Sequence, residues 1–365
     1  MSSLKVEILK IEEISEHPNA DKLELARLKG WFCVIQKDKY KVGDKVVYIP
    51  VDSVLPETLE ADIFGKDSKV KLSKHRVKTI KLRGAISQGL VVNLKDVGLV
   101  WDTAVGADVT DKLGITKYEP PSPRFQGMGN KTKKRYKSNT NFHKYTSIEN
   151  IKNNHKVFDP EDDVVITEKI HGTNFRAGWV PYDPNTWWKK IKHLVGLAPK
   201  HEFIYGSHNV QLSQKLLYKG YYDKNVYADA VVTHNLKEKL GPGQVVYGEI
   251  YGPNIQKGYG YGLKEGQTKL IVFDVMQDGK YLNHINIPIF GALHSLDVVP
   301  VLYEGKFAEV DLDKIVGGKS SLCGCQKIRE GVVVRPQVEA KCHIGRKILK
   351  SINSEYLLKE NTEFH

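Results

Sequence analysis

A lysine and a glycine stand close together where a predicted strand ends, in the segment Glu168-Lys169-Ile170-His171-Gly172-Thr173-Asn174. The apolar run in Asp162–Thr167 predicts a short buried strand, which would fix the direction of the Lys169 side chain. A lysine amine with a pKa of about 10.4 becomes a nucleophile only where burial or neighbouring cations lower that pKa. Gly172 would let a phosphate of a ligand approach the backbone. For this motif alone, a surface lysine at a strand end is the simpler interpretation.

Four further segments supply the other groups that chemistry at a phosphate needs. Each segment alone is more often structural. Together they offer two carboxylates, a flat ring and a cation cluster, which could bind a nucleotide, hold a divalent metal and stabilise charge at phosphorus. In chain order they are Val245–Gly252 with Glu249, Leu270–Val275 with Phe273, Glu330–Arg335 beginning at Glu330, and Arg346–Lys350 with Lys347 and Lys350.

The order and spacing of these five segments resemble the covalent nucleotidyltransferase superfamily of ATP-dependent ligases and mRNA capping enzymes. Within it, K-I-H-G-T-N is similar to the RNA ligase branch, whereas DNA ligases usually show K-x-D-G. The resemblance covers roughly residues 142–358. It implies an ATP-dependent RNA ligase that joins RNA ends bearing a 3′-hydroxyl and a 5′-phosphate, with ATP as substrate and Mg²⁺ or Mn²⁺ as the metal.

The resemblance also implies a role for each motif. Lys169 would carry AMP as the catalytic nucleophile, and Phe273 would lie against the adenine ring. Glu330 would hold the metal or its waters, with Glu249 at the ribose hydroxyls and as a second metal candidate. Lys347 and Lys350 would be the catalytic cations at the phosphates, and His171 would contact RNA. The further residues expected to bind the nucleotide are Glu168, Ile170, Gly172, Asn174 and His208.

Two positions depart from the family pattern. His208 stands where the family usually has the arginine of Ser-Arg-Asn, and histidine is a weaker, pH-dependent substitute for arginine at a phosphate or ribose. Ile348 stands where the last motif, Lys-x-Lys, has its first lysine. Lys350 matches the second lysine, and Lys347 could serve as the other from the neighbouring position.

The N-terminal part reads as short strands separated by turns, which predicts a small barrel such as an OB-fold. His17–Leu23 resembles the opening of the tRNA-binding OB module of some aminoacyl-tRNA synthetases. Gly43–Pro50 and the N-terminal position resemble the Naegleria-type RNA ligases, which place this domain first. The strand-like runs are Val6–Ile14, Leu23–Gln36, Lys45–Ile49, Arg76–Arg83 and Gly89–Leu94.

The predicted fold class is therefore α+β. An OB-fold β-barrel is followed by a nucleotidyltransferase domain, an ATP-grasp-like ligase domain of antiparallel sheets with flanking helices. Residues 181–201 look like a helical insertion, in which Trp187 and Trp188 are expected to give hydrophobic cover rather than to stack bases. The expected boundaries are residues 1–117 for the OB domain, 118–141 for a basic linker and 142–365 for the adenylyltransferase domain.

Positive charge is concentrated in one stretch of the chain. The net charge is +12, and residues 121–157 contribute +8 of it, with nine lysines and arginines against one acid, Glu149. Such a segment attracts a polyanion by releasing its counterions, which favours RNA, although a solvated basic linker is the alternative. The expected RNA contacts are Lys131, Lys133, Lys134, Arg135 and Lys137.

Cysteine usage and hydropathy predict a soluble intracellular protein. The four cysteines do not suggest a disulfide framework in a chain of 365 residues. Cys323-Gly324-Cys325 with Cys342-His343 could imitate a zinc site, but free cysteines in a reducing compartment fit better. No run of about 18 apolar residues and no signal-peptide block appears, so we expect no membrane. No obligate protein partner is evident from the sequence either.

Two alternatives stay open at this stage. The first is an ATP-dependent DNA ligase or a capping-type nucleotidyltransferase, against which the histidine of K-I-H-G and the N-terminal OB domain argue. The second is a non-catalytic RNA-binding protein that retains the fold. The presence of Lys169, Glu249, Glu330 and Lys350 argues against it.

Overall fold

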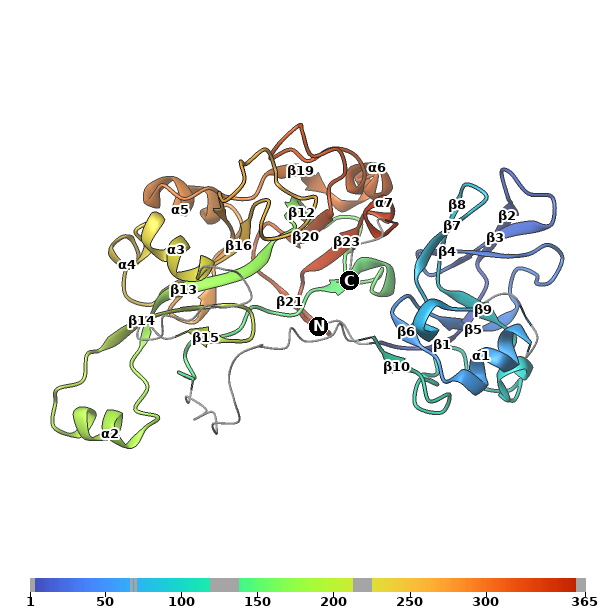
Figure 1. The fold of residues 1–365 in the computed structure, drawn as a ribbon, viewed down its shortest axis with the longest axis horizontal. Coiled ribbons are helices and arrows are strands. Elements are labelled where there is room, and N and C mark those ends of the chain that lie inside the picture. Colours follow the sequence, from blue (N-terminus) through green and yellow to red (C-terminus); the bar gives the residue numbers. More distant parts are fainter. Residues whose placement is uncertain (1–3, 66–67, 69–70, 119–137, 213–224, 359–365) are drawn as a thin grey trace. The chain divides into compact units, whose positions relative to one another are not determined.

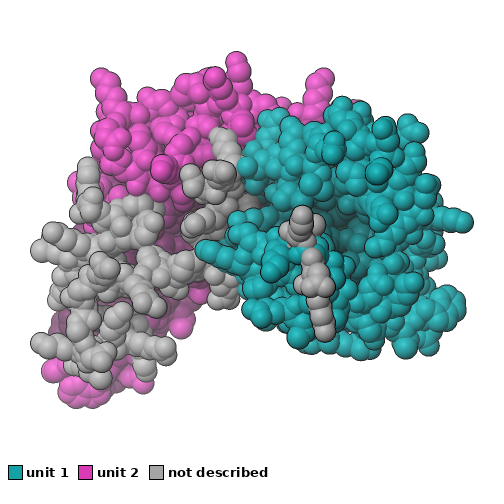
Figure 2. All heavy atoms as spheres, turned by 45° about the vertical axis from the view of Figure 1, so that its right-hand side comes forward, with its two compact units in different colours: residues 1–121, 148–156, 352–365 teal, residues 122–147, 157–351 magenta. Residues whose placement is uncertain are grey.

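The computed structural model describes residues 4–65, 68, 71–118, 138–212 and 225–358. The chain forms two compact units, coloured separately in Figure 2. Among the described helices, none is both long and apolar enough to cross a membrane. Unit 1 comprises Met1–Pro121, Ile148–Lys156 and Ile352–His365, and unit 2 comprises Ser122–Ser147 and Val157–Ser351.

Unit 1 is built from short antiparallel strands, as the sequence predicts. The run Leu23–Gln36 is a hairpin rather than one strand, because the chain turns at Lys29, whose φ is 54°. The sheets have the orders β1-β5-β9, β2-β3-β4, β7-β8 and β10-β6. The strands are β1 (Glu7–Lys10), β2 (Glu13–Glu16), β3 (Leu23–Leu28), β4 (Trp31–Gln36), β5 (Lys45–Ile49), β6 (Ser53–Val54), β7 (Thr79–Leu82), β8 (Ala85–Gln88), β9 (Leu90–Val92), β10 (Thr116–Lys117) and β11 (Glu149–Asn150).

Alternating burial along the strands gives unit 1 its core. In β4 the side chains of Trp31, Cys33 and Ile35 are buried while Phe32 is exposed, as a half-buried strand requires. The helix α1 (Glu57–Phe64), which the sequence analysis did not anticipate, adds Leu59 to an apolar cluster with β1, β5 and β9. Among the described residues of this unit, the other α-helix is α7 (Ser354–Leu357).

Unit 2 contains a large antiparallel sheet with the order β15-β14-β13-β16-β17-β18; its strands β13 to β16 are labelled in Figure 1. Its core is formed with α3, α4 and α5, whose apolar side chains join those of the strands in one buried cluster. The strands are β13 (Thr173–Pro181), β14 (His201–Gly206), β15 (Gln211–Leu212), β16 (Gln244–Tyr251), β17 (Lys269–Gln277) and β18 (Lys280–Tyr281); the helices are α3 (Val226–Thr233), α4 (Leu236–Lys239) and α5 (Asn286–His294).

A second sheet of unit 2 has the strands β23, β20, β12 and β19 side by side, in that order. β12 and β20 each lie between two neighbouring strands and are mostly buried, and each has an apolar centre, Val164–Ile166 in β12 and Val332–Val334 in β20. The elements are β12 (Asp163–Lys169), β19 (Val301–Lys306), β20 (Gly331–Pro336) and β23 (Leu349–Ile352), with α6 (Leu312–Val316) and the hairpin β21 (Lys341–Cys342) and β22 (Gly345–Arg346) nearby in the chain.

Three details differ from the sequence-based expectations. Arg346–Lys350 is not one strand: it spans the end of β22 and the start of β23. The insertion between β13 and β14 does contain a helix, α2 (Trp187–Leu194), but Trp187 and Trp188 are 66% and 69% exposed, so they do not provide the expected cover. Cys323 and Cys325 form a disulfide, which makes the expectation of free thiols wrong for this pair.

Candidate active site

Strand register brings the predicted nucleophile and the predicted metal ligand together. Lys169 is the last residue of β12 and lies opposite Gly331, the first residue of β20. Glu330 immediately precedes that strand, and Lys169 Nζ donates a hydrogen bond of 2.8 Å to Glu330 Oε1. Both side chains are largely removed from solvent, with 29% of Lys169 and 6% of Glu330 exposed. Residues 161 positions apart therefore meet because β12 and β20 are antiparallel neighbours.

The second carboxylate comes from the other sheet. After Lys169 the chain crosses from β12 to β13, where Asn174 lies opposite Glu249 of β16. A Cβ atom at Gly172 would lie 2.2 Å from the Ile250 carbonyl oxygen, so only glycine fits at this crossing. The sequence analysis assigned that glycine to the approach of a phosphate. The structure gives a different reason, the close passage of the chain over β16.

A glycine- and tyrosine-rich loop after β16 holds this crossing in place. The Tyr261 hydroxyl accepts a hydrogen bond of 2.9 Å from the His171 backbone N–H. Gln256 Nε2 donates to the Gly172 carbonyl at 3.0 Å, and the ring of Tyr259 packs edge-on against His171 at 4.9 Å between centroids. Sequence reasoning missed these residues. The available signal was the run Gly258-Tyr259-Gly260-Tyr261-Gly262, shortly after the Glu249 motif.

The two carboxylates control the protonation of Lys169. Burial lowers the pKa of Lys169, but the negative charges of Glu330 and Glu249 raise it, and the net pKa lies above its ordinary value. Burial also raises the pKa of Glu249 to about 8, with Lys169 opposing the rise and Glu330 adding to it. The expectation that the surroundings lower the pKa of Lys169 is therefore wrong for this arrangement. Its amine is held as a cation until the carboxylate charge is offset.

Glu330 is suited to a divalent cation. Its Oε2 atom is buried and accepts no hydrogen bond from a described residue, and His171 Nδ1 lies 3.8 Å from it. A hard carboxylate oxygen without a partner fits Mg²⁺ or Mn²⁺. Among the described residues, no group of three or more histidine, cysteine, aspartate or glutamate side chains could hold a metal ion by itself. The residues thus fit a cation that keeps waters and takes further ligands from phosphates.

Phe273 occupies an irregularity in β17. Tyr247 lies opposite Asp274 and Gly248 opposite Val272, so Phe273 is the extra residue of a β-bulge beside the Glu249 strand. Its ring packs edge-on against Tyr145, with 4.9 Å between centroids. A bulge of this kind re-aims one side chain without breaking the sheet, and it leaves Phe273 partly exposed.

The cations of Arg346–Lys350 do not act as one group. The Arg346 guanidinium is buried and bonds to Asp274 and Glu339. Lys347 Nζ donates to Asp162 Oδ2 at 2.6 Å. Asp162 lies seven residues before Lys169, at the other end of β12 and hence about 20 Å along the strand. This corrects the expectation that Lys347 reaches the same phosphates as Lys169. Lys350 lies on β23, beside β20.

The remaining predicted site residues divide into three groups. Glu168 and Ile170 flank Lys169 and are buried, and Glu168 Oε2 accepts a hydrogen bond of 2.7 Å from Ser321 N–H. His208 lies in the turn between β14 and β15, where burial and the charges of Arg176 and Lys144 lower its pKa. The RNA contacts predicted in the basic segment lie outside the described residues; they are Lys131, Lys133, Lys134, Arg135 and Lys137.

Comparison with known proteins gives a family match for each of the two parts of the chain. A model of an OB-fold domain matches residues 5–94. The model of the RNA ligase family matches residues 162–352, more than half of the chain. The phenylalanine–tRNA ligase β subunit of Geobacter metallireducens is 32% identical over 125 residues, and the match covers 30% of this chain and 14% of that protein.

Solved structures of a Naegleria gruberi RNA ligase share the fold over nearly the whole chain. A mutant apo form has a TM-score of 0.70 and 23% identity, covering 98% of both chains. A mutant solved with ATP and Mn has a TM-score of 0.69 and 22% identity, covering 97% of this chain and 98% of that one. The sequence-based expectation of an α+β chain with an N-terminal OB-fold is thereby confirmed. The chain belongs to the RNA ligase family, with an OB-fold domain ahead of its ligase domain.

Proposed function

We propose that this chain is an ATP-dependent RNA ligase that works through a covalent bond between Lys169 and AMP. The observation that carries the proposal is the Lys169 amine, 2.8 Å from Glu330 Oε1 and within the electrostatic field of Glu249. The Naegleria gruberi enzyme of the same fold has been solved with ATP and Mn and with AMP and Mn, which supports ATP as the nucleotide here. The proposed substrate is RNA with a 3′-hydroxyl and a 5′-phosphate.

The chemistry needs three transfers at phosphorus. The Lys169 amine loses its proton to solvent and attacks the α-phosphorus of ATP, and the bond to the β-phosphate breaks to release pyrophosphate. An oxygen of the RNA 5′-phosphate then attacks the same phosphorus and releases Lys169. Finally the RNA 3′-hydroxyl attacks the 5′-phosphorus, its proton is lost, and AMP departs. Each step exchanges one bond at phosphorus for another.

The described residues suit these transfers by position and charge. A divalent cation bound at Glu330, with Glu249 as the second candidate, would offset negative charge on the carboxylate and on the triphosphate. The charge of Glu330 would then raise the pKa of Lys169 less strongly, so the amine would lose its proton more readily and become available for attack. We assign the ribose to Glu249, the adenine to Phe273 and the phosphates to Lys350. The further assignments are nucleotide contacts for Glu168, Ile170, Gly172, Asn174 and His208, and an RNA contact for His171.

The mass of the intact protein tests the first step. Incubation with ATP and Mg²⁺ should add one AMP to the wild type, and Lys169→Met should abolish the adduct because no other amine takes its place. Lys306→Met is the matched control, since Lys306 lies on β19 next to β12 and pairs with Asp163. An adduct that persists in Lys169→Met would overturn the assignment. Labelling by GTP instead of ATP would favour the capping-type alternative.

We assign RNA binding to the basic linker, residues 118–141, between an OB domain of residues 1–117 and an adenylyltransferase domain of residues 142–365. Replacing its five clustered cations with glutamine should weaken RNA binding and flatten its dependence on salt, by about 0.9 in the slope for each duplex phosphate that is no longer neutralised. The formation of the Lys169 adduct should be nearly unchanged, because it requires only ATP and metal. A failure to form the adduct with unchanged RNA affinity would assign the linker to the nucleotide instead. The replaced residues are Lys131, Lys133, Lys134, Arg135 and Lys137.

A further inference from the structure

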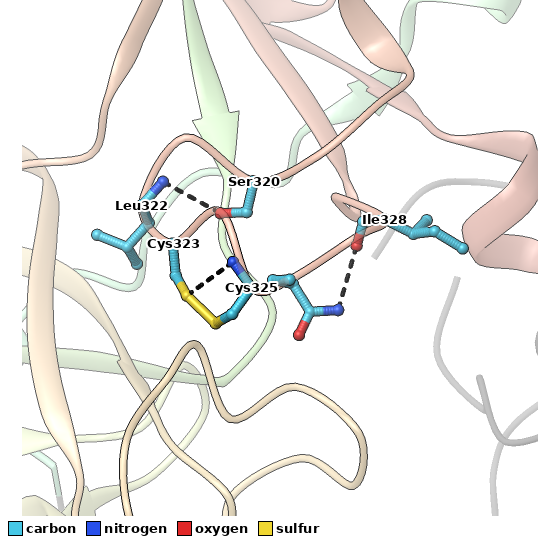
Figure 3. The surroundings of a disulfide bond; sticks show 6 residues. Ser320, Leu322, Cys323, Cys325 and Ile328 are labelled. Atoms are coloured by element: carbon cyan, nitrogen blue, oxygen red, sulfur yellow. Dashed lines mark hydrogen bonds between the residues drawn. A yellow bond between two sulfur atoms is a disulfide. The ribbon is translucent and has the colours of Figure 1, made fainter.

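The loop between α6 and β20 carries a disulfide next to the candidate active site. Cys323 and Cys325 are bonded through their sulfurs, and hydrogen bonds run from Leu322 N–H to Ser320 Oγ and from Cys325 N–H to Cys323 Sγ (Figure 3). Gln326 N–H also donates to the Cys323 carbonyl. Cys325 is exposed and Cys323 is partly exposed. Reagents in solution can therefore reach the bond, as a reversible disulfide requires.

One side of this loop holds the residue next to the nucleophile. Ser321 N–H donates a hydrogen bond of 2.7 Å to Glu168 Oε2, and Glu168 immediately precedes Lys169. The Glu168 carboxylate is buried, and its other oxygen accepts no hydrogen bond from a described residue. Without the hydrogen bond from Ser321, a buried carboxylate would be poorly satisfied, which costs free energy and displaces the strand end.

The disulfide itself rests on the loop that holds the other side of the Lys169 segment. A Cβ atom at Gly262 would lie 3.2 Å from Cys323 Sγ and 3.3 Å from Cys325 Sγ, so the sulfurs lie directly against this glycine. Tyr261, the preceding residue, accepts the hydrogen bond from His171 N–H. The base of the disulfide loop is closed by Arg329 N–H to the Gly318 carbonyl at 2.9 Å, and the next residue is Glu330.

We propose that Cys323 and Cys325 are a reversible thiol–disulfide modification site whose oxidised form positions the Lys169 segment for nucleotidyl transfer. This rests on the function proposed above. The oxidised form is the one in which Glu168, His171 and Glu330 have the contacts just described. The site is chemically separate from Cys33, which is buried, and from Cys342, which has no disulfide partner.

The redox step balances with a low-molecular-weight disulfide as the oxidant. One cysteine thiolate attacks the reagent disulfide and forms a mixed disulfide, releasing one reagent thiolate. The second cysteine thiolate attacks the protein sulfur of that mixed disulfide and releases the second reagent thiolate. The two protein thiols lose two electrons and two protons in total, and the reagent disulfide becomes two thiols. A dithiol reductant reverses both exchanges. Reduction frees the Cys323–Cys325 loop and so loosens its hold on Ser321 and Gly262.

The rate of AMP adduct formation, measured after full reduction and after reoxidation, tests the proposal. Reduction of the wild type should lower the rate of adduct formation by roughly three- to tenfold, because the positioning hydrogen bonds are weakened. Reoxidation should restore the rate. Cys323→Ser and Cys325→Ser should show the slow rate in both conditions. Cys342→Ser, the matched control, should respond to redox conditions as the wild type does. Equal wild-type rates in both conditions, or an absent response in Cys342→Ser, would overturn the proposal.

Two further measurements keep the proposal separate from the proposed function and from misfolding. Alkylation before and after reduction should identify Cys323 and Cys325 as the reducible pair. If both cysteines are alkylated in protein that has not been reduced, the disulfide is contradicted. Amide hydrogen exchange in Glu168–Asn174 should speed up on reduction, because the His171 amide loses protection. If no adduct forms in either redox state, the proposed function fails. The amide hydrogen exchange then tests by itself whether the disulfide positions the Lys169 segment. An exchange rate that reduction does not change overturns this role.

Discussion

Unit 2 contains two buried groups of charges that are built differently. The Lys169 site, comprising Lys169, Glu249 and Glu330, has one cation for two acidic groups, and Glu330 Oε2 accepts no hydrogen bond from a described residue. The Asp274 cluster, comprising Asp274, Arg335, Glu339 and Arg346, has two cations for two acids.

The difference lies in the carboxylate oxygens that remain for a ligand to satisfy. Asp274 is fully buried; its Oδ2 accepts from the Tyr145 hydroxyl and from Arg346 and lies 3.2 Å from Arg335 Nη1, while Oδ1 accepts from Val275 N–H. Its acceptor sites are filled by the protein itself. The Lys169 site leaves Glu330 Oε2 without a hydrogen bond from a described residue, and burial raises the pKa of Glu249 to about 8, so this carboxyl is largely protonated at neutral pH. A cluster whose carboxylate oxygens are filled by the protein stabilises the fold, whereas one with an open carboxylate oxygen is prepared for a cation and a nucleotide.

The largest expected effect follows from neutralising Glu330 in the Lys169 site. Glu330→Gln should lower the rate of AMP adduct formation by at least about 100-fold and change its metal dependence, because the carboxylate that suits the cation is removed. Titrating the adduct rate with Mg²⁺ and with Mn²⁺ measures this. Glu339→Gln, which removes an acid from the Asp274 cluster, should leave the metal titration unchanged. Matching titrations for Glu330→Gln and the wild type would break the comparison.

Removing the shared acceptor of the balanced cluster should instead affect stability. Asp274→Ala leaves Arg335 and Arg346 buried with too little negative charge and should lower the free energy of unfolding by about 3–5 kcal/mol. Urea denaturation measures the change. Asp278→Asn, in the exposed turn after β17, should stay within about 0.5 kcal/mol of the wild type. A stable Asp274→Ala protein would show that the cluster does not support the fold.

A smaller effect should appear with pH at the edge of the same cluster. Burial and the charge of Arg335 lower the pKa of His284 to about 4 in the folded protein. Between pH about 6.5 and 4 the unfolded chain binds a proton that the folded chain does not. The free energy of unfolding should therefore decrease by up to about 3 kcal/mol as the pH is lowered through this range. His284→Gln should flatten this slope in denaturation at pH 7, 6 and 5. The exposed His193→Gln should keep it, and a slope unaffected by His284→Gln would contradict the argument.

The sequence was sufficient to predict the strands that carry the motifs, but not β13, β14 or β19. β12, β16, β17 and β20 appear where apolar runs predict them, because a strand buried on both faces needs a continuous apolar sequence. The motif around Lys169 was recognisable because its residue types lie together in the chain. Lys347 shows the limit: its neighbour in the sequence, Arg346, indicates nothing about Asp162, 185 residues away, which determines where its amine lies.

The sequence by itself determined which residues can do chemistry and which segments form strands, since both depend on local composition. Only the tertiary structure decided which of these groups meet. The register of β12 with β20 brings Glu330 to Lys169, and the crossing at Gly172 brings in Glu249. The same folding pairs Cys323 with Cys325 beside Tyr261 and Gly262, and it joins Asp274 to arginines 61 and 72 positions further along the chain. Such contacts depend on strand pairing and packing between distant segments, which no local pattern in the sequence specifies.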